Sequence, residues 1–225
     1  MIKLNMMKLL IIIVIYLNVA INTFATAQFP DRLIYNGVRY NLTVNPMELY
    51  FNNNPDKRPR PNVTSSALWR GYIATFEIIQ NELWVVDIII DVSTFDYEKR
   101  RFTNDYKSVI QECLDGRDRM KLDWFNGILI LPQGRIIEYV HMGYDSIYEN
   151  YVLILIENGN YIREINLNNV QYIRLRNNVR ESFRNSSEYQ ELQNKINNGT
   201  FTEEDLQYFI YIFSTINLNN NILEE

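Results

Sequence analysis

Apolar and polar residues alternate along much of the chain up to position 168, a period typical of β-strands, and the spacing lengthens afterwards. The alternation is clearest in WRGYIATFEIIQNELWVVDIIIDV at 69–92, where two apolar runs flank polar residues at 80–82. We predict a hairpin with a three-residue loop, so that Ile79 faces Leu83. One face would then be entirely apolar, with Tyr72, Ala74, Phe76 and Ile78 opposite Ile90, Ile88, Val86 and Trp84.

Two further hairpins are marked by Asn-Gly pairs, the residues that a tight two-residue turn favours. One pair lies at 36–37 between the short apolar runs of 33–42, and the other lies at 158–159 within 148–167. We expect both pairs to form the tips of antiparallel hairpins.

A fourth hairpin is expected over 125–144, with its turn at Pro132-Gln133-Gly134. Counting outward from this turn puts Phe125 opposite His141, the only histidine of the chain. An imidazole beside aromatic and aliphatic side chains is better suited to packing than to proton transfer, because buried polar groups on such faces are usually satisfied by a partner.

Helical spacing appears at 46–51 after Asn45, at 104–114, and twice near the end of the chain. Ser187 and Gln190 match a capping box for a helix that ends at Gly199, and Thr202 begins the last helical stretch. A proline-rich loop is expected between 52 and 66. Strands followed by helices predict an α+β fold, an antiparallel sheet of successive hairpins with C-terminal helices on or beside it.

The first 27 residues have the layout of a secretory signal peptide. Lys3 and Lys8 precede an apolar run at 9–17, and Ala25-Thr26-Ala27 supplies small residues for cleavage. The run is shorter than the roughly 20 residues that span a bilayer, so no membrane span is expected after cleavage. We therefore predict an exported protein, periplasmic or extracellular, with a β-rich part at 28–168 and a helical segment at 169–225 that belongs to the same globular unit.

Charge and cysteine content narrow the possible partners. Cleavage would remove two lysines and no acidic residue, which changes the formal charge from −5 to roughly −7. An acidic chain is poorly suited to nucleic acid, so no nucleic-acid partner is expected. Cys113 is the only cysteine, and no intrachain disulfide can form.

Catalytic and cofactor motifs are few. One histidine and one cysteine cannot supply the ligands of a zinc site, and the phosphate-loop, dinucleotide and nucleophile-elbow motifs do not occur, so no metal or cofactor is expected. A dyad of Cys113 and His141 is disfavoured, because Glu112 and Asp115 would raise the pKa of the thiol. Glu77, Asp87 and Asp91 could share one strand face, as glycosidase carboxylates do, although an acidic outer face is also ordinary for a solvated sheet.

Aromatic residues and arginine gather where loops meet strands, in LWRGY at 68–72 and LDWFNG at 122–127. Such residues dominate many recognition surfaces. The candidate binding residues are Trp69, Arg70, Tyr72, Trp124 and Tyr144. In the alternative interpretation, the two tryptophans close the ends of the core and Arg70 forms a structural ion pair with an acid such as Asp123.

The blocks LWRGY, DWFNG, LPQG and YVHMGY together resemble a family of bacterial hypothetical proteins without an established activity, over residues 33–159. The resemblance implies a bacterial source, and hence the periplasm or the cell exterior. It assigns a role to no residue.

Two functions compete. The first is an exported module that binds another protein, of an immunity, adaptor or envelope type. The alternative is a periplasmic hydrolase or lyase, or a small-ligand binder, that uses His141 with Asp123 and Arg70. An enzyme would require His141, an acid and Arg70 to converge in a pocket, whereas a binding module would expose its aromatic residues.

Overall fold

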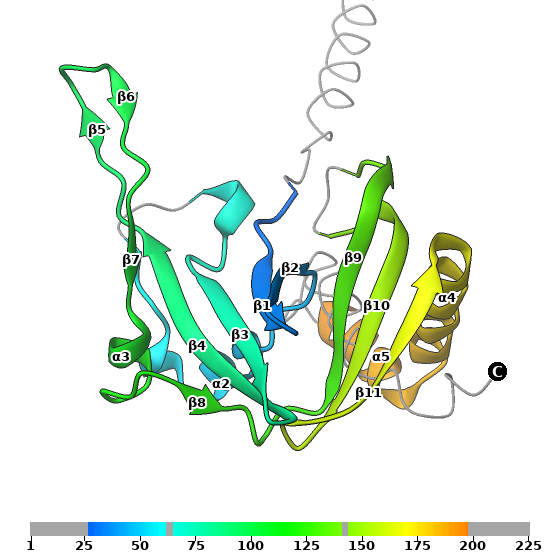
Figure 1. Ribbon diagram of the computed structural model, residues 1–225. Coiled ribbons are helices and arrows are strands. Elements are labelled where there is room, and N and C mark those ends of the chain that lie inside the picture. The colour runs from blue at the N-terminus through cyan, green and yellow to red at the C-terminus, as the bar shows by residue number, and fades with distance from the viewer. Residues whose placement is uncertain (1–26, 62–64, 141–143, 198–225) are drawn as a thin grey trace, which may run out of the picture.

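The computed structural model describes residues 27–61, 65–140 and 144–197, and it confirms the predicted α+β fold (Figure 1). The strands are β1 (Asp31–Tyr35), β2 (Val38–Leu42), β3 (Ile73–Ile79), β4 (Glu82–Asp91), β5 (Phe95–Asp96), β6 (Arg101–Phe102), β7 (Tyr106–Ser108), β8 (Met120–Lys121), β9 (Gly127–Glu138), β10 (Ile147–Glu157) and β11 (Asn160–Asn168). The helices are α2 (Met47–Asn53), α3 (Ile110–Cys113), α4 (Asn169–Arg184) and α5 (Ser187–Asn197), with short 3-10 turns η1 (Pro55–Lys57) and η2 (Ser66–Leu68).

The main sheet runs in the order β2-β1-β3-β4-β11-β10-β9, and β7 and β8 add to β4. All of its pairs are antiparallel except the parallel pair of β1 and β3. The β3–β4 and β9–β11 groups meet at the lower end of Figure 1, where Asn160 pairs with Glu82, and they splay apart above it. The two ends of the sheet order, β2 and β9, also approach each other. The Thr43 N–H, directly after β2, donates to the Ile130 carbonyl of β9 at 3.1 Å.

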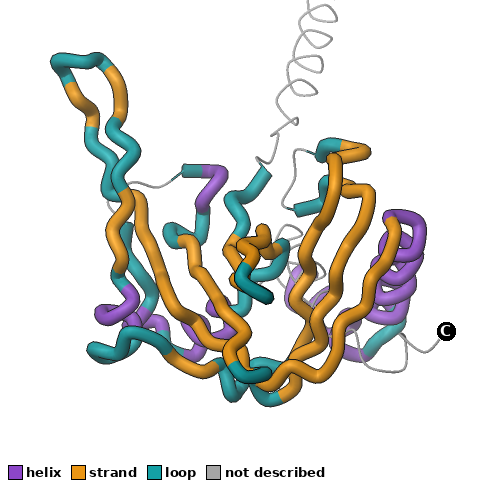
Figure 2. Tube along the Cα trace, viewed as in Figure 1, coloured by secondary structure: helices purple, strands orange, loops and turns teal. Residues whose placement is uncertain are grey.

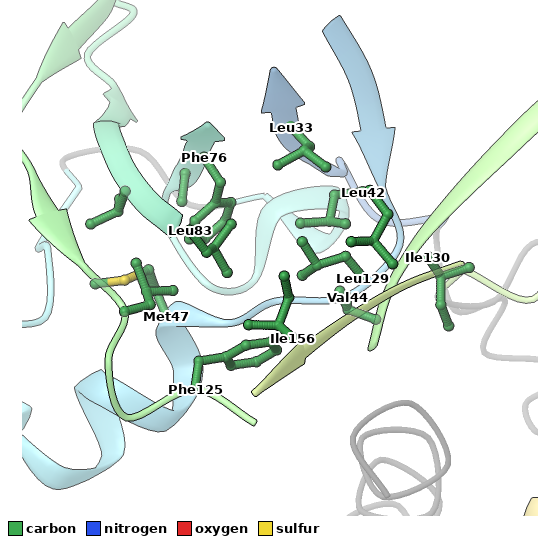
Figure 3. Packing of buried hydrophobic residues seen from close by; sticks show 14 of the residues in the cluster. Leu33, Leu42, Val44, Met47, Phe76, Leu83, Phe125, Leu129, Ile130 and Ile156 are labelled. Carbon is green, nitrogen blue, oxygen red and sulfur yellow. The ribbon is translucent and has the colours of Figure 1, made fainter. Parts of the chain in front are cut away.

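A single hydrophobic core joins both groups of strands. Leu33 of β1 and Phe76 of β3 pack in the same cluster as Leu129 of β9 and Ile156 of β10 (Figure 3). Helix α4 packs against β10 and β11 and places Leu175 in this cluster. A capping box between Asn168 and Gln171 stabilises the first turn of α4, and the sequence analysis did not identify it.

The β3–β4 hairpin was predicted with the wrong loop. Its turn has two residues, Gln80 and Asn81, both with positive φ, so that Ile79 faces Glu82 and not Leu83. Leu83 and Val85 therefore point into the core, where Trp84 and Val86 were expected. A bulge between Thr75 and Phe76 then restores the predicted pairing of Ala74 with Ile88. The sequence shows the alternation of faces but not the extra residue that shifts it.

The predicted hairpin over 125–144 is wrong. Pro132 and Gly134 lie inside the continuous strand β9, which pairs with β10 along its length. Proline is tolerated because β9 is the last strand of the sheet order, and Gly134 (φ +76°) lies at a bulge, where a Cβ would approach Glu149 Oε2 to 2.5 Å. The pairing of Phe125 with His141 therefore fails, and His141 itself lies outside the described residues.

The Asn-Gly hairpins are both confirmed, as β1–β2 and β10–β11. The predicted helix over 104–114 is mostly wrong, because Tyr106–Ser108 pairs with β4 and only Ile110–Cys113 is helical. Helix α5 is confirmed, although Ser186 accepts the Tyr189 N–H in place of the predicted cap at Ser187. The stretch that begins at Thr202 lies outside the described residues.

Candidate functional site

The LWRGY segment places two consecutive side chains, those of Trp69 and Arg70, in different environments. Turn η2 is capped by the Ser65 hydroxyl, which accepts the Ala67 N–H, and Trp69 follows it with 46% of its surface exposed. Arg70 is buried, and Gly71 has φ +80°, with Pro61 Cγ only 2.7 Å from the place of a Cβ. Any other residue at position 71 would be both in an unfavourable conformation and in collision with Pro61. The chain can therefore turn inward at Arg70 and enter β3.

Arg70 is held by three oxygen atoms. Its Nη2 donates to the Phe29 carbonyl at 2.8 Å and lies 3.4 Å from Asp31 Oδ1, and its Nη1 donates to the Tyr144 hydroxyl at 2.9 Å. The side chains of Arg70 and Asp31 are both fully buried. Such a pair is stable only when its remaining polar atoms are satisfied.

The partners of Arg70 also bond to one another. Asn45 Nδ2 donates to Asp31 Oδ2 at 2.9 Å and to the Tyr144 hydroxyl at 3.2 Å, and the Ala74 N–H donates to Asp31 Oδ1 at 2.9 Å. The Tyr144 hydroxyl donates its own proton to the Phe29 carbonyl. We call Asp31, Asn45, Arg70 and Tyr144 the Arg70 cluster. It ties β1, the start of β3 and the segment before β10 together.

A second buried carboxylate lies next to this cluster. Glu48 of α2 accepts a bidentate pair of hydrogen bonds from Arg58 at 2.9 and 3.0 Å, and the Tyr72 hydroxyl donates to it at 2.7 Å. The Tyr72 ring in turn lies 5.7 Å from the Arg70 guanidinium. Arg58 belongs to the predicted proline-rich loop, and its ion pair with Glu48 holds its side chain partly buried.

Burial dominates the electrostatics of the Arg70 cluster. It raises the pKa of Asp31, against the opposing effect of Arg70, and it raises the pKa of Tyr144 to about 12. Burial alone would lower the pKa of Arg70, but the Asp31 carboxylate reverses this effect and leaves the pKa above its usual value. Arg70 therefore stays protonated.

The hydrogen bonds of the Arg70 cluster are made within the protein, except that Arg70 Nε is buried without a partner in the described part of the chain. Arg70 and Tyr144 share the Phe29 carbonyl, so they fix the main chain immediately before β1. The arrangement is suited to joining segments of the fold.

The other predicted site residues lie apart from this cluster. The ion-pair partner of Arg70 is Asp31, and Asp123, which was proposed for that role, is exposed between β8 and β9. Trp124 is half-buried there, with its ring stacked on Tyr50 at 6.2 Å. This segment contacts the Asn158–Gly159 turn, at the end of β3 opposite to Trp69. Trp124 thus closes one end of the core, whereas Trp69 remains exposed at the other.

Cys113, Asp87 and Asp91 are each engaged by neighbouring parts of the fold. Cys113 is buried, and burial followed by the charge of Glu112 raises the pKa of its thiol to about 11, as expected for a packed cysteine. Asp87 accepts a hydrogen bond from the Ser108 hydroxyl, and Asp91 accepts the Ser93 N–H. Within the described ranges, no group of three or more His, Cys, Asp or Glu side chains comes together as a metal site requires.

One exposed feature was missed by sequence reasoning. Residues 92–105 form a two-stranded ribbon, which we call the β5–β6 arm, and it projects from the upper end of the molecule (Figures 1 and 2). Phe95, Tyr97 and Phe102 are 39%, 84% and 63% exposed on this arm. The alternation of these rings with Thr94 and Asp96 was the available signal, but it is too short to distinguish a projecting ribbon from a loop.

No protein-family model, curated protein or solved structure matches this chain. Among the described helices, none is long and apolar enough to cross a membrane.

Proposed function

We propose that this protein is exported and binds another protein through the end of the molecule that carries Trp69 and the β5–β6 arm. The observation that carries the proposal is the exposure of Trp69, Tyr97 and Phe102 at this end. Large aromatic side chains are usually buried, and those left in solvent commonly mark recognition surfaces. The predicted leader and the resemblance to bacterial proteins support a periplasmic or extracellular location.

The enzymatic alternative has less support. It needs Arg70 and Asp123 beside His141, but Arg70 is engaged by Asp31, Phe29 and Tyr144, and Asp123 is exposed at the other end of β3. Two of the three proposed catalytic groups are therefore separated. For this reason we favour protein binding over the activity of a hydrolase or a lyase and over the binding of a small ligand.

The experiment expresses the full chain, with its leader, in a bacterial host and recovers the protein from the periplasm and medium. N-terminal sequencing is expected to begin at Gln28. The recovered protein is then used for affinity capture from its own cells, beside a Trp69→Ala variant and the control Ile162→Ala, which removes an exposed side chain from β11. We expect a retained protein that Trp69→Ala weakens and Ile162→Ala does not. Retention of no protein, with a rise in melting temperature on adding metabolites, would contradict the proposal.

A further inference from the structure

We infer that the β5–β6 arm is the element that enters the partner protein, and that the partner offers an apolar recess flanked by carboxylates. This inference rests on the proposed binding function and adds the contact element and the chemistry of its target. It comes from three properties of the arm, namely its polar framework, its unpartnered apolar face and its tip charges.

Hydrogen bonds between polar groups hold the arm in shape. The Val92 N–H donates to the Asp105 carbonyl at 2.9 Å, and Thr94 and Thr103 exchange two further bonds of 2.9 Å. At the tip, Asp96 Oδ1 accepts the N–H groups of the residues two and three positions later, each at 3.0 Å. Isolated two-stranded ribbons are marginally stable in water, so these hydrogen bonds are needed to stabilise the conformation of the arm. Tyr97 and Phe102 stay mostly exposed when the arm adopts this conformation.

The rings lie together on one face of the ribbon. Phe95 is paired with Phe102 across the strands, and Tyr97 follows two positions later on the same side. The ring centroids of Phe95 lie 5.0 Å from Tyr97 and 5.2 Å from Phe102, both in edge contacts. The cluster is thus preformed, with Tyr97 and Phe102 mostly in solvent and Phe95 partly covered by them. A preformed cluster loses less conformational entropy when a partner covers it.

The charges at the tip indicate what surrounds the recess. Lys99 is paired with Asp96 at 3.3 Å, whereas Glu98, Arg100 and Arg101 form no ion pair with any residue that the structure describes, so the tip keeps an excess of one positive charge. Carboxylates on the partner would complement these guanidinium groups.

Two other occupants fit less well. The segment 93–105 has as many acidic as basic residues, so it lacks the excess of positive charge that an anionic bilayer attracts. A symmetric contact between the arms of two copies would place the arginines of one arm near the identical arginines of the other, and these like charges repel. A different protein with an acidic rim around an apolar recess is the occupant that the charges favour.

The test replaces Tyr97 with the photoreactive p-benzoylphenylalanine in the full chain, expressed in its own cells, and uses the same replacement at Ile162 as a control. Irradiation is expected to attach a different protein at position 97 and not at position 162. Mass spectrometry of the adduct should locate the attachment at apolar residues with Asp or Glu beside them. Phe102→Ala, and separately Arg100→Glu with Arg101→Glu, should lower the adduct yield about tenfold or more, as for central contact residues.

An adduct with a second copy, or with lipid, would overturn the inference, as would an unchanged yield in the arginine variant. If a protein is retained in affinity capture and Trp69→Ala weakens its retention, but no protein is attached at position 97, the arm inference fails while the binding function stands. If no protein is attached or retained at all, the binding function fails as well. Equal melting temperatures of all variants show that each result concerns contact and not folding.

Discussion

The Arg70 cluster and the β5–β6 arm place arginine and aromatic residues in opposite environments. In the cluster, the arginine is fully buried and its partners are Asp31, Tyr144 and a main-chain carbonyl. In the arm, the polar main chain and small polar side chains make the internal bonds, and the rings remain exposed. Residue type alone therefore does not distinguish a residue that holds the fold from one that is available to a partner.

The two regions lie at the same end of the molecule. The cluster precedes the start of β3, the arm follows the end of β4, and these strands are antiparallel neighbours with Ile73 opposite Ile89 (Figure 1). The buried cluster thus holds the start of β3, which pairs with the end of the strand that leads into the arm. A rigid base favours binding because less conformational freedom is lost on association.

The largest predicted effect comes from breaking the buried ion pair. Arg70→Met should lower the free energy of unfolding by about 3–5 kcal/mol, because Asp31 would remain buried without its cation. Urea unfolding measures this loss, and the matched variant Arg100→Met, in the arm, should leave the unfolding midpoint unchanged. Equal effects of the two substitutions would remove the distinction between the regions.

Tyr144→Phe should lower the free energy of unfolding by about 1–3 kcal/mol, because it leaves the hydrogen bonds of Arg70 and Asn45 without their acceptor. Tyr97→Phe is the control in the arm and should change nothing measurable. A loss below the experimental error for Tyr144→Phe would show that water replaces the hydroxyl.

The contribution of Tyr144 to the free energy of unfolding should also depend on pH. Burial raises the pKa of Tyr144 to about 12, so the folded state holds this proton more tightly than an unfolded chain, whose tyrosines titrate near about pH 10. The stabilisation is therefore complete below about pH 10 and is lost as the pH rises through about 12. The stability difference between the wild type and Tyr144→Phe should stay constant at neutral pH and decrease in alkaline urea titrations.

Gly71→Ala should destabilise the fold by about 1–2 kcal/mol from the positive φ alone. The contact with Pro61 adds to this loss unless the proline moves. The control is Gly37→Ala, which also has positive φ but nothing within 4 Å of the added Cβ. Thermal melting of both variants separates the conformational part from the collision, and equal losses would show that Pro61 yields freely.

The smallest effect is expected in the arm. Phe102→Ala should change the free energy of unfolding by no more than about 0.5 kcal/mol, because the ring is mostly in solvent and outside the core. Chemical denaturation measures this change, with Phe76→Ala as a buried counterpart that should lose about 3–5 kcal/mol. A large loss for Phe102→Ala would mean that the ring supports the fold.

Local signals predicted some elements well. The Asn-Gly turns were located correctly because a tight turn depends on the conformations of two adjacent residues. Pro132-Gln133-Gly134 was misread for the same reason, since the tripeptide suits either a turn or a bulge in an edge strand, and only the pairing with β10 distinguishes them. The short strand β7 was taken for helix because its partner, β4, lies outside any local window.

The candidate site was predicted in its residues but not in its contacts. Arg70, Tyr72 and Tyr144 were identified and do lie near one another, with Arg70 bonded to the Tyr144 hydroxyl and beside the Tyr72 ring. The acid was misassigned, because Asp31 lies 39 positions before Arg70 and nothing in the local pattern connects them. The arm was missed because solvent exposure, and not composition, distinguishes its rings from core residues.

The sequence by itself determined the α+β class, the two Asn-Gly turns and the candidate residues of the WRGY segment, because these depend on the alternation of neighbouring side chains and on the conformations that single residues allow. The tertiary structure alone decided which carboxylate neutralises Arg70, where the bulges shift the register, and which aromatic residues remain in solvent. These outcomes depend on contacts between segments distant in the chain, and a burial-driven energy is set by what covers a side chain and not by its neighbours in sequence.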